Sequence, residues 1–254
     1  MDRERLWRSH DRQKATYRNA MKPVIMRAFE DQIQPLYDKI ILVSDIRDLE
    51  IPPLNDGAIE LGYQRIYQVT AADYAKRKRK QLRKSLKGDD EIFEDLILDH
   101  IRVYLRDQLG TEIKAVGSTS VKLIQQLLNQ LIPEIMDSGV GGGSAQTMLR
   151  DRIKSEWHEM KYYRTERLVR TEINRASNWG ALEGTKSIGA EMWKVWLSAF
   201  ANESRPEHMA ADGQRVDLYD AFEVGGEQLQ YPSDPAGSAG MTINCLCSFY
   251  ETLK

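Results

Sequence analysis

Apolar residues recur at intervals of three and four along most of the chain before residue 184, a spacing that gives an α-helix one apolar face. Proline and glycine at several positions are expected to kink or end these helices, namely at Pro23, Pro35, Gly110, Pro133 and Gly184. The pattern therefore predicts long amphipathic helices over about residues 2–39, 58–86, 89–109, 120–136 and 145–183.

Four glycines in five residues, at 139–143, form the clearest break in this pattern. A stretch so rich in glycine is flexible, and such stretches often join domains. We therefore predict an N-terminal helical region over residues 1–138 and a C-terminal region over residues 144–254, with the glycine-rich joint between them.

Beyond Gly189 the chain changes character, because glycine, proline, aspartate and serine become frequent up to Asn244. Apolar residues at 192–200 and 241–250 predict strands at either end of this part. The predicted fold class is mainly α with a small α+β C-terminal region, in which long amphipathic helices are followed by a loop-rich end with a few short strands.

Charge and cysteine content exclude several classes of protein. Lysine and arginine number 36 against 38 acidic residues, a formal net charge of -2, so the whole molecule has no electrostatic reason to coat nucleic acid. The two cysteines, Cys245 and Cys247, are too close in sequence for an unstrained disulfide, which indicates synthesis in a reducing cytosol. No apolar run approaches the ~20 residues that span a bilayer, so we expect no membrane role.

The cysteine pair is the best candidate for a metal site. Two residues apart in a predicted strand, Cys245 and Cys247 would point to the same face, and a local bend could bring both thiolates onto one ion. His208 could be a third ligand and Asp212 or Asp234 a fourth, which would complete the tetrahedral set that zinc prefers. The alternative is that no cofactor binds and the cysteines are small buried side chains in a tight corner.

A polar motif on the last predicted helix is interpreted as structural. Arg170, Asn174 and Asn178 form one ridge at intervals of four residues, while Glu172 has Arg175 three residues on as its nearest partner. A buried carboxylate must be paired, so we expect a structural salt bridge here. Downstream, Asp212-Gly213-Gln214 predicts a tight turn into which His208 could also hydrogen-bond.

Residues 76–87 contain eight basic residues among twelve and are followed directly by acidic ones. They could form a solvated surface helix, or they could contact phosphates of DNA without sequence preference. The candidate contacts are Lys76, Arg77, Lys78, Arg79, Lys80, Arg83, Lys84 and Lys87.

From Arg167 onward the chain resembles the C-terminal region of the phage Mu F-like head morphogenesis family. The matching pieces are Arg170-Thr171-Glu172 with Asn174, Ala176, Asn178 and Gly180; Arg205-Pro206-Glu207-His208 with Asp212-Gly213-Gln214; Tyr231-Pro232 with Asp234-Pro235; and Asn244-Cys245-Leu246-Cys247. Leu246 departs from the family, whose members usually carry arginine there, and some relatives have a cysteine pair where this chain has only His208.

This resemblance implies a structural minor head protein of a tailed bacteriophage, made in the bacterial cytoplasm and located in the virion head. Its expected partners are the portal protein, the major capsid protein and packaged double-stranded DNA, and its expected roles are head assembly, DNA packaging or DNA delivery. The motif positions that carry over as structural are Arg170, Glu172, Asn178, Asp212, Gly213 and Asn244.

We expect no catalytic residues, because the chain has no nucleophile elbow, no phosphate-binding glycine loop and no helical histidine pair. It is therefore predicted not to be an enzyme. Two alternatives stay open: a DNA-binding accessory virion protein that uses residues 76–87, and an enzyme similar to ADP-ribosyltransferases. Ser118-Thr119-Ser120 resembles a segment of those enzymes, but no Glu-x-Glu follows it.

Overall fold

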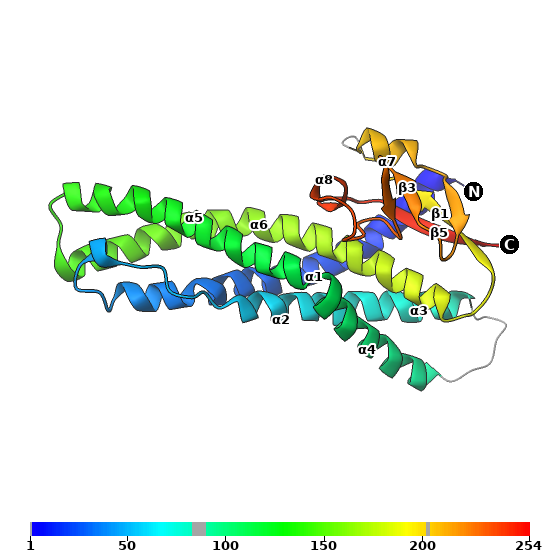
Figure 1. The fold of residues 1–254 in the computed structure, drawn as a ribbon, viewed down its shortest axis with the longest axis horizontal. Coiled ribbons are helices and arrows are strands. Elements are labelled where there is room, and N and C mark those ends of the chain that lie inside the picture. Colours follow the sequence, from blue (N-terminus) through cyan, green and yellow to red (C-terminus); the bar gives the residue numbers. More distant parts are fainter. Residues whose placement is uncertain (1, 83–89, 202–203) are drawn as a thin grey trace. The chain divides into compact units, whose positions relative to one another are not determined.

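The protein is described by a computed structural model that covers residues 2–82, 90–201 and 204–254, without the side chains of residues 90–92. The predicted fold class is confirmed, because 69% of the described residues are helical and a few short antiparallel strands lie near the C-terminal end (Figure 1). Among the helices described, none combines the length and the apolar character needed to cross a bilayer.

The helices, in chain order, are α1 (Arg3–Ile40), the 3-10 turn η1 (Ile46–Asp48), α2 (Asp56–Ile66), the π-helical turn η2 (Tyr67–Ala71), α3 (Ala72–Leu82), α4 (Asp90–Gln108), α5 (Gly110–Asp137), α6 (Gly142–Lys186), α7 (Pro206–Ala210) and α8 (Ala239–Thr242). The strands are β1 (Met192–Leu197), β2 (Arg215–Asp217), β3 (Phe222–Val224), β4 (Glu227–Leu229) and β5 (Ser248–Leu253).

The predicted helix ends are wrong at two glycines, while the first helix runs past its two prolines, as its predicted range of 2–39 implies. Pro23 and Pro35 lie inside α1, Gly110 begins α5 instead of capping α4, and Gly184 lies inside α6. Each helix continues because its apolar face stays buried past the breaker: Leu36, one residue after the second proline of α1, is fully buried. Tertiary burial outweighs the local cost of a missing hydrogen bond or a flexible residue.

The chain forms two compact units, each assembled from segments far apart in sequence. The helical unit comprises Pro23–Tyr63 and Leu109–Glu166, and the mixed unit comprises Met1–Lys22, Gln64–Gln108 and Arg167–Lys254. The glycines at 139–143 lie in the helical unit, where Gly139 and Gly141 connect α5 to α6 and Gly142 and Gly143 begin α6, and the predicted domain division there stays a prediction.

In the helical unit, segments of α1, α2, α5 and α6 run side by side (Figure 1). Their shared core is apolar, and it also holds a few satisfied polar groups. Trp157 donates its indole N–H to the carbonyl of Phe29 at 3.2 Å. The Gln32 amide donates to Asp56 at 2.7 Å and accepts from the Ser120 hydroxyl at 2.8 Å, so these buried polar atoms are paired.

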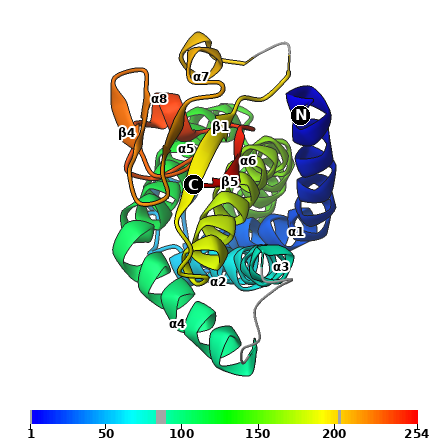
Figure 2. The ribbon, with the colours of Figure 1, turned by 90° about the vertical axis from the view of Figure 1, so that its right-hand side faces the viewer.

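The mixed unit contains a three-stranded antiparallel sheet in the order β2-β1-β5 and a separate hairpin, β3-β4. Figure 2 shows the sheet beside the second half of α6, and the Thr185 hydroxyl on α6 donates to the Glu251 carboxylate on β5 at 2.8 Å. Within the sheet Trp196 lies opposite Phe249, next to the last pair of the two strands, Leu197 and Ser248.

Two glycines allow α6 to approach η2 and α3 closely. A Cβ added at Gly180 would lie 2.2 Å from the carbonyl oxygen of Ala71, and one at Gly184 would lie 2.4 Å from that of Ala75. The glycines and the alanines are each four residues apart, so both pairs repeat along one helical face. This glycine-alanine seam is a backbone-to-backbone contact that no larger residue could replace.

Candidate metal centre

His208 is held by the short helix α7. Pro206 is the first residue of this helix, where its missing N–H and fixed backbone angle favour helix initiation. The imidazole of His208 is buried and packs edge-on against the Trp196 ring, with ring centroids 5.8 Å apart. Neighbours on two sides therefore fix the orientation of the ring.

Cys245 and Cys247 precede the last strand and do not lie in it. The prediction of a strand from residue 241 is wrong, because residues 239–242 are helical and β5 begins at Ser248. The backbone carbonyls of Leu246 and Cys247 accept hydrogen bonds from side chains and not from a neighbouring strand. The Leu246 carbonyl accepts from the Trp7 indole at 3.0 Å, and the Cys247 carbonyl accepts from the Asn178 amide at 3.1 Å.

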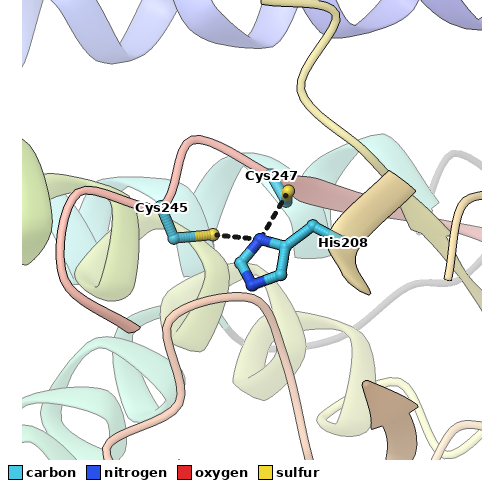
Figure 3. A group of neighbouring side chains, drawn as sticks. All are labelled: His208, Cys245 and Cys247. Atoms are coloured by element: carbon cyan, nitrogen blue, oxygen red, sulfur yellow. Dashed lines mark hydrogen bonds between the residues drawn. The ribbon is translucent and has the colours of Figure 1, made fainter. Parts of the chain in front are cut away.

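The structure brings His208, Cys245 and Cys247 together (Figure 3). One donor atom from each lies within 4.8 Å of the others, and the His208 Nδ1 atom is 3.6 Å from the Cys245 sulfur and 3.4 Å from the Cys247 sulfur. All three side chains are buried. This group could hold a metal ion, as the residue types had indicated.

Cys245 and Cys247 shift each other's pKa in opposite directions. A hydrogen bond from the Cys247 thiol, with further help from His208, lowers the pKa of Cys245 well below its usual value. The same hydrogen bond to Cys245, together with burial, raises the pKa of Cys247 well above its usual value. Cys245 is therefore the thiol that loses its proton more readily, and a bound cation would favour the thiolate form of both residues.

Two further groups favour negative charge on the sulfurs. The backbone N–H of Ala199 donates to the Cys247 sulfur at 3.4 Å. The Lys14 ammonium is fully buried and donates to Asn174 at 2.6 Å and to the Ser248 hydroxyl at 2.6 Å. Burial lowers the pKa of Lys14 to about 8, and the charge of Cys245 opposes this shift.

The structure does not place the proposed fourth ligand in the group. The Asp234 carboxylate accepts the backbone N–H groups of Gln230 at 2.7 Å and Ala236 at 3.0 Å, so it braces a turn. The alternative ligand, Asp212, accepts the N–H of Ser198 at 2.9 Å and forms an ion pair with Arg3 at 3.0 Å. Both carboxylates are engaged by backbone donors that a sequence pattern cannot reveal.

The motif on α6 forms a buried network. Glu172 and Arg175 pair at 2.9 Å with only 3% and 1% of their side chains exposed, and the Tyr67 hydroxyl donates to Glu172 at 3.1 Å. Arg175 also donates to the Ser233 carbonyl at 2.8 Å. The Asn178 amide donates to the Pro232 carbonyl at 3.0 Å, so this helix holds the 232–233 loop in place.

Two other motif positions adopt left-handed backbone conformations. Gly213 has φ of 83° and donates its N–H to the Trp196 carbonyl on β1 at 2.9 Å, while the Gln214 N–H donates to the Ala211 carbonyl at 2.9 Å and closes the predicted turn. Asn244 has φ of 59°, an angle that asparagine tolerates better than most residues, and its N–H donates to the Thr171 hydroxyl at 3.0 Å. The latter bond aims the chain toward Cys245.

A cavity of about 210 Å³ adjoins the three candidate ligands. Its other lining residues come from α6, from the segment after β1 and from the segment before Cys245: Arg170, Ala199, Ala201, Ser204, Arg205, Asn244 and Leu246. Sequence reasoning had singled out Arg170 and Asn244 here but missed Arg205 as a site residue. It also missed Trp7 and Lys14, because no local pattern links them to partners more than 230 residues away.

The basic segment is described only as far as Leu82, and Arg83, Lys84 and Lys87 lie outside the described residues. Four of the five remaining basic side chains have partners within the protein. Lys76 pairs with Glu94, Arg77 with Asp73, Lys78 with Glu251 at 2.8 Å, and Arg79 donates to Ser187 at 3.0 Å. Lys80 is exposed, and contact with DNA stays a prediction.

The chain is similar to one curated protein of named activity. It is 27% identical over 135 residues to an NAD(+)–arginine ADP-ribosyltransferase of Enterococcus faecalis, a match that covers 52% of this chain and 26% of the relative. The chain thus spans about a quarter of the length of that relative. No family model and no solved structure matches the chain.

The prediction that the chain is not an enzyme is contradicted by this match, since the relative is named as a transferase. The prediction relied on the absence of short catalytic motifs, and such motifs detect only the reaction classes for which they are known. Ser118, Thr119 and Ser120, the residues that resembled such enzymes, lie in α5 with their hydroxyls bonded to helix carbonyls at 2.8 to 3.1 Å.

Proposed function

We propose that this chain is a minor head protein of a tailed bacteriophage, located in the virion head and bound to the portal protein or to the inner surface of the major capsid protein. Its role would be in head assembly, DNA packaging or DNA delivery. Contact with packaged double-stranded DNA is a further part of the proposal.

One observation carries this proposal: the residues of the head-protein motif converge in a single unit. Asn178 bonds to both the 232–233 loop and the cysteine segment, and Asn244 is anchored on the same helix, α6. These polar groups form hydrogen bonds that hold α6, the 232–233 loop and the cysteine segment together, so the motif has a structural role in this unit. Because the residues that carry the resemblance to the head-protein family are structural, they support a fold of this unit that is shared with that family.

The composition of purified virions tests this proposal. Virions from the phage that encodes the chain should contain it together with the portal protein, and a phage that lacks its coding sequence should give misassembled or poorly infective heads. Virions that contain portal protein and are fully infective without this chain would contradict the proposal.

We further propose that zinc is the metal at His208, Cys245 and Cys247. Tetrahedral zinc with Zn–S near 2.3 Å and Zn–N near 2.0 Å requires sulfur and nitrogen ligands about 3.5 Å apart. The observed distances of 3.6 and 3.4 Å from His208 Nδ1 to the two sulfurs fit that requirement. Zinc would tie the cysteine segment to α7 and so supply folding energy to the unit.

Metal analysis of the purified full chain tests the zinc site. We expect about one equivalent of zinc, lost in the Cys245→Ser/Cys247→Ser variant. Asp234→Asn is the matched control, because this residue caps a turn outside the group, and it should keep its zinc. A wild-type protein that is purified with zinc present, remains metal-free and melts normally would refute the site.

A second candidate function, arginine ADP-ribosyltransferase activity, is favoured by the match to the Enterococcus faecalis protein. The purified chain should be incubated with NAD+ and an arginine-containing acceptor, with the heat-inactivated chain as control. Release of nicotinamide together with ADP-ribose on the acceptor would establish this function. If neither product exceeds the control, this candidate fails for the chain as given.

A further inference from the structure

The cavity beside the metal centre is lined by all three candidate ligands. Zinc takes four ligands, and a site with three protein ligands keeps its fourth position for water or another molecule. Within the described part of the chain, the group that could hold a metal contains three residues, and Asp212 and Asp234 are engaged elsewhere. The fourth position of a bound ion would therefore face this cavity.

The charge of the cavity selects the kind of molecule that could fill that position. A divalent ion with two thiolates and a neutral imidazole has no net charge. Arg170 and Arg205 line the cavity, and none of its lining residues is Asp or Glu. The surroundings are therefore positive, which favours an anion over a neutral or cationic ligand.

The two arginines differ in their hydrogen-bond partners. Arg205 donates to the Ile243 carbonyl at 2.6 Å, so it also helps to hold the segment before Cys245. Arg170 Nε is buried and has no hydrogen-bond partner among the described residues. Because an unsatisfied buried donor is costly, a ligand that accepts from Arg170 would be stabilised by more than an exposed ion pair.

We propose that this cavity binds a small oxyanion, a carboxylate or a phosphate, through one oxygen on the metal and a second on the Arg170 guanidinium. Both anions have at least two oxygens, so one oxygen can bind the metal while another accepts a charge-assisted hydrogen bond from the guanidinium. The proposal rests on the metal centre proposed above and adds a ligand site to it. The metal ligands would then have a binding role as well as a structural one.

The test uses the full chain loaded with Co²⁺, whose visible absorption reports the ligands around it and which binds the same kinds of side chain as zinc. Acetate and inorganic phosphate are added separately over the millimolar range, with chloride as the control for ionic strength. We expect a saturable change in the cobalt spectrum with acetate or phosphate and none with chloride. The anion that binds at the lower concentration identifies the ligand class.

Arg170→Gln should leave the cobalt spectrum without anion unchanged and weaken anion binding about tenfold, since a charge-assisted hydrogen bond contributes at least the corresponding free energy. Arg167→Gln is the matched control, because this exposed arginine lies on the same helix outside the cavity. Arg170→Lys, which keeps the charge but loses the fork, should give an intermediate affinity and provides a second variant if Arg170→Gln does not fold.

The outcomes separate the two proposals. A protein that binds one equivalent of Co²⁺ with a thiolate spectrum that neither anion alters would refute the ligand site and leave the metal centre standing. A protein that binds no cobalt or zinc would overturn both. Equal anion affinity in wild type and Arg170→Gln would also refute the ligand site, because the observed anion would then bind without the arginine that defines it.

Discussion

The glycine-alanine seam between α6 and the η2-α3 segment yields a prediction that opposes helix propensity. Gly180 lies inside a long helix, where replacement of glycine by alanine usually stabilises by about 1 kcal/mol. In this protein the added Cβ would lie 2.2 Å from the Ala71 carbonyl oxygen and 2.8 Å from the Ala71 Cα atom. Ordinary contact begins near 3.4 Å, so the two backbones would have to separate by about an ångström.

Overpacking of a core typically costs 1–3 kcal/mol, and a contact with backbone cannot be relieved by a change of rotamer, so the upper end, about 3 kcal/mol, is expected. After subtraction of the gain in propensity, Gly180→Ala should destabilise the protein by about 2 kcal/mol. For a chain of this size that corresponds to a fall in Tm of roughly 4 to 8 °C.

Urea unfolding followed by circular dichroism, together with a thermal melt, measures this change. Gly110→Ala is the matched control, because Gly110 is also helical but an added Cβ there meets nothing within 4 Å. The control should be neutral or slightly stabilising. If Gly180→Ala is as stable as wild type, the close approach of the two backbones is refuted.

Three further changes have defined outcomes. Burial lowers the pKa of Lys194 to about 8 from 10.5, so between these values the unfolded chain binds a proton that the folded chain lacks, and Lys194 should make stability rise with pH by up to about 3 kcal/mol. Urea titrations of Lys194→Met across this window should show a smaller rise than wild type, and the part that remains includes the contribution of Lys14, whose pKa is also lowered to about 8. Glu172→Gln should lower the free energy of unfolding by about 3 kcal/mol, because it leaves the Arg175 guanidinium charged and buried. In the same urea unfolding assay, the double variant Glu172→Gln/Arg175→Met should recover much of that loss. Lys80→Gln should leave Tm unchanged while weakening DNA retention at low salt, and equal retention would mean that this exposed lysine is only solvated.

Two features could be predicted from the sequence, for different reasons: the helical fold class and the cluster of His208, Cys245 and Cys247. Apolar periodicity marks a buried helix face directly, whereas the cluster was predictable because the chain has only two cysteines and the motif supplied the histidine. Helix ends were less predictable: Gly184 ends nothing because Ala75 packs against it. That contact belongs to the tertiary structure.

The residues around those three could not be predicted from local sequence patterns. Asp234 had the correct chemistry for a ligand, but two backbone N–H groups bind its carboxylate. Lys14 and Trp7 belong to the first helix, and no sequence pattern singles them out. A pattern in one segment does not reveal which distant backbone carbonyl will need a donor.

The bond from the Trp7 indole to the Leu246 carbonyl joins residues 239 positions apart, and this has a consequence for how the protein is made. A ribosome that adds 5–20 residues per second releases Trp7 roughly 10 to 50 seconds before Leu246. During that time the first helix has no cysteine segment to hold, and no cation can be captured between Cys245 and Cys247. A chain that ends before residue 245 would lack both thiols, so on the proposal of a metal at His208, Cys245 and Cys247 the metal content of a preparation would distinguish chains that contain the cysteine segment from chains that stop before it.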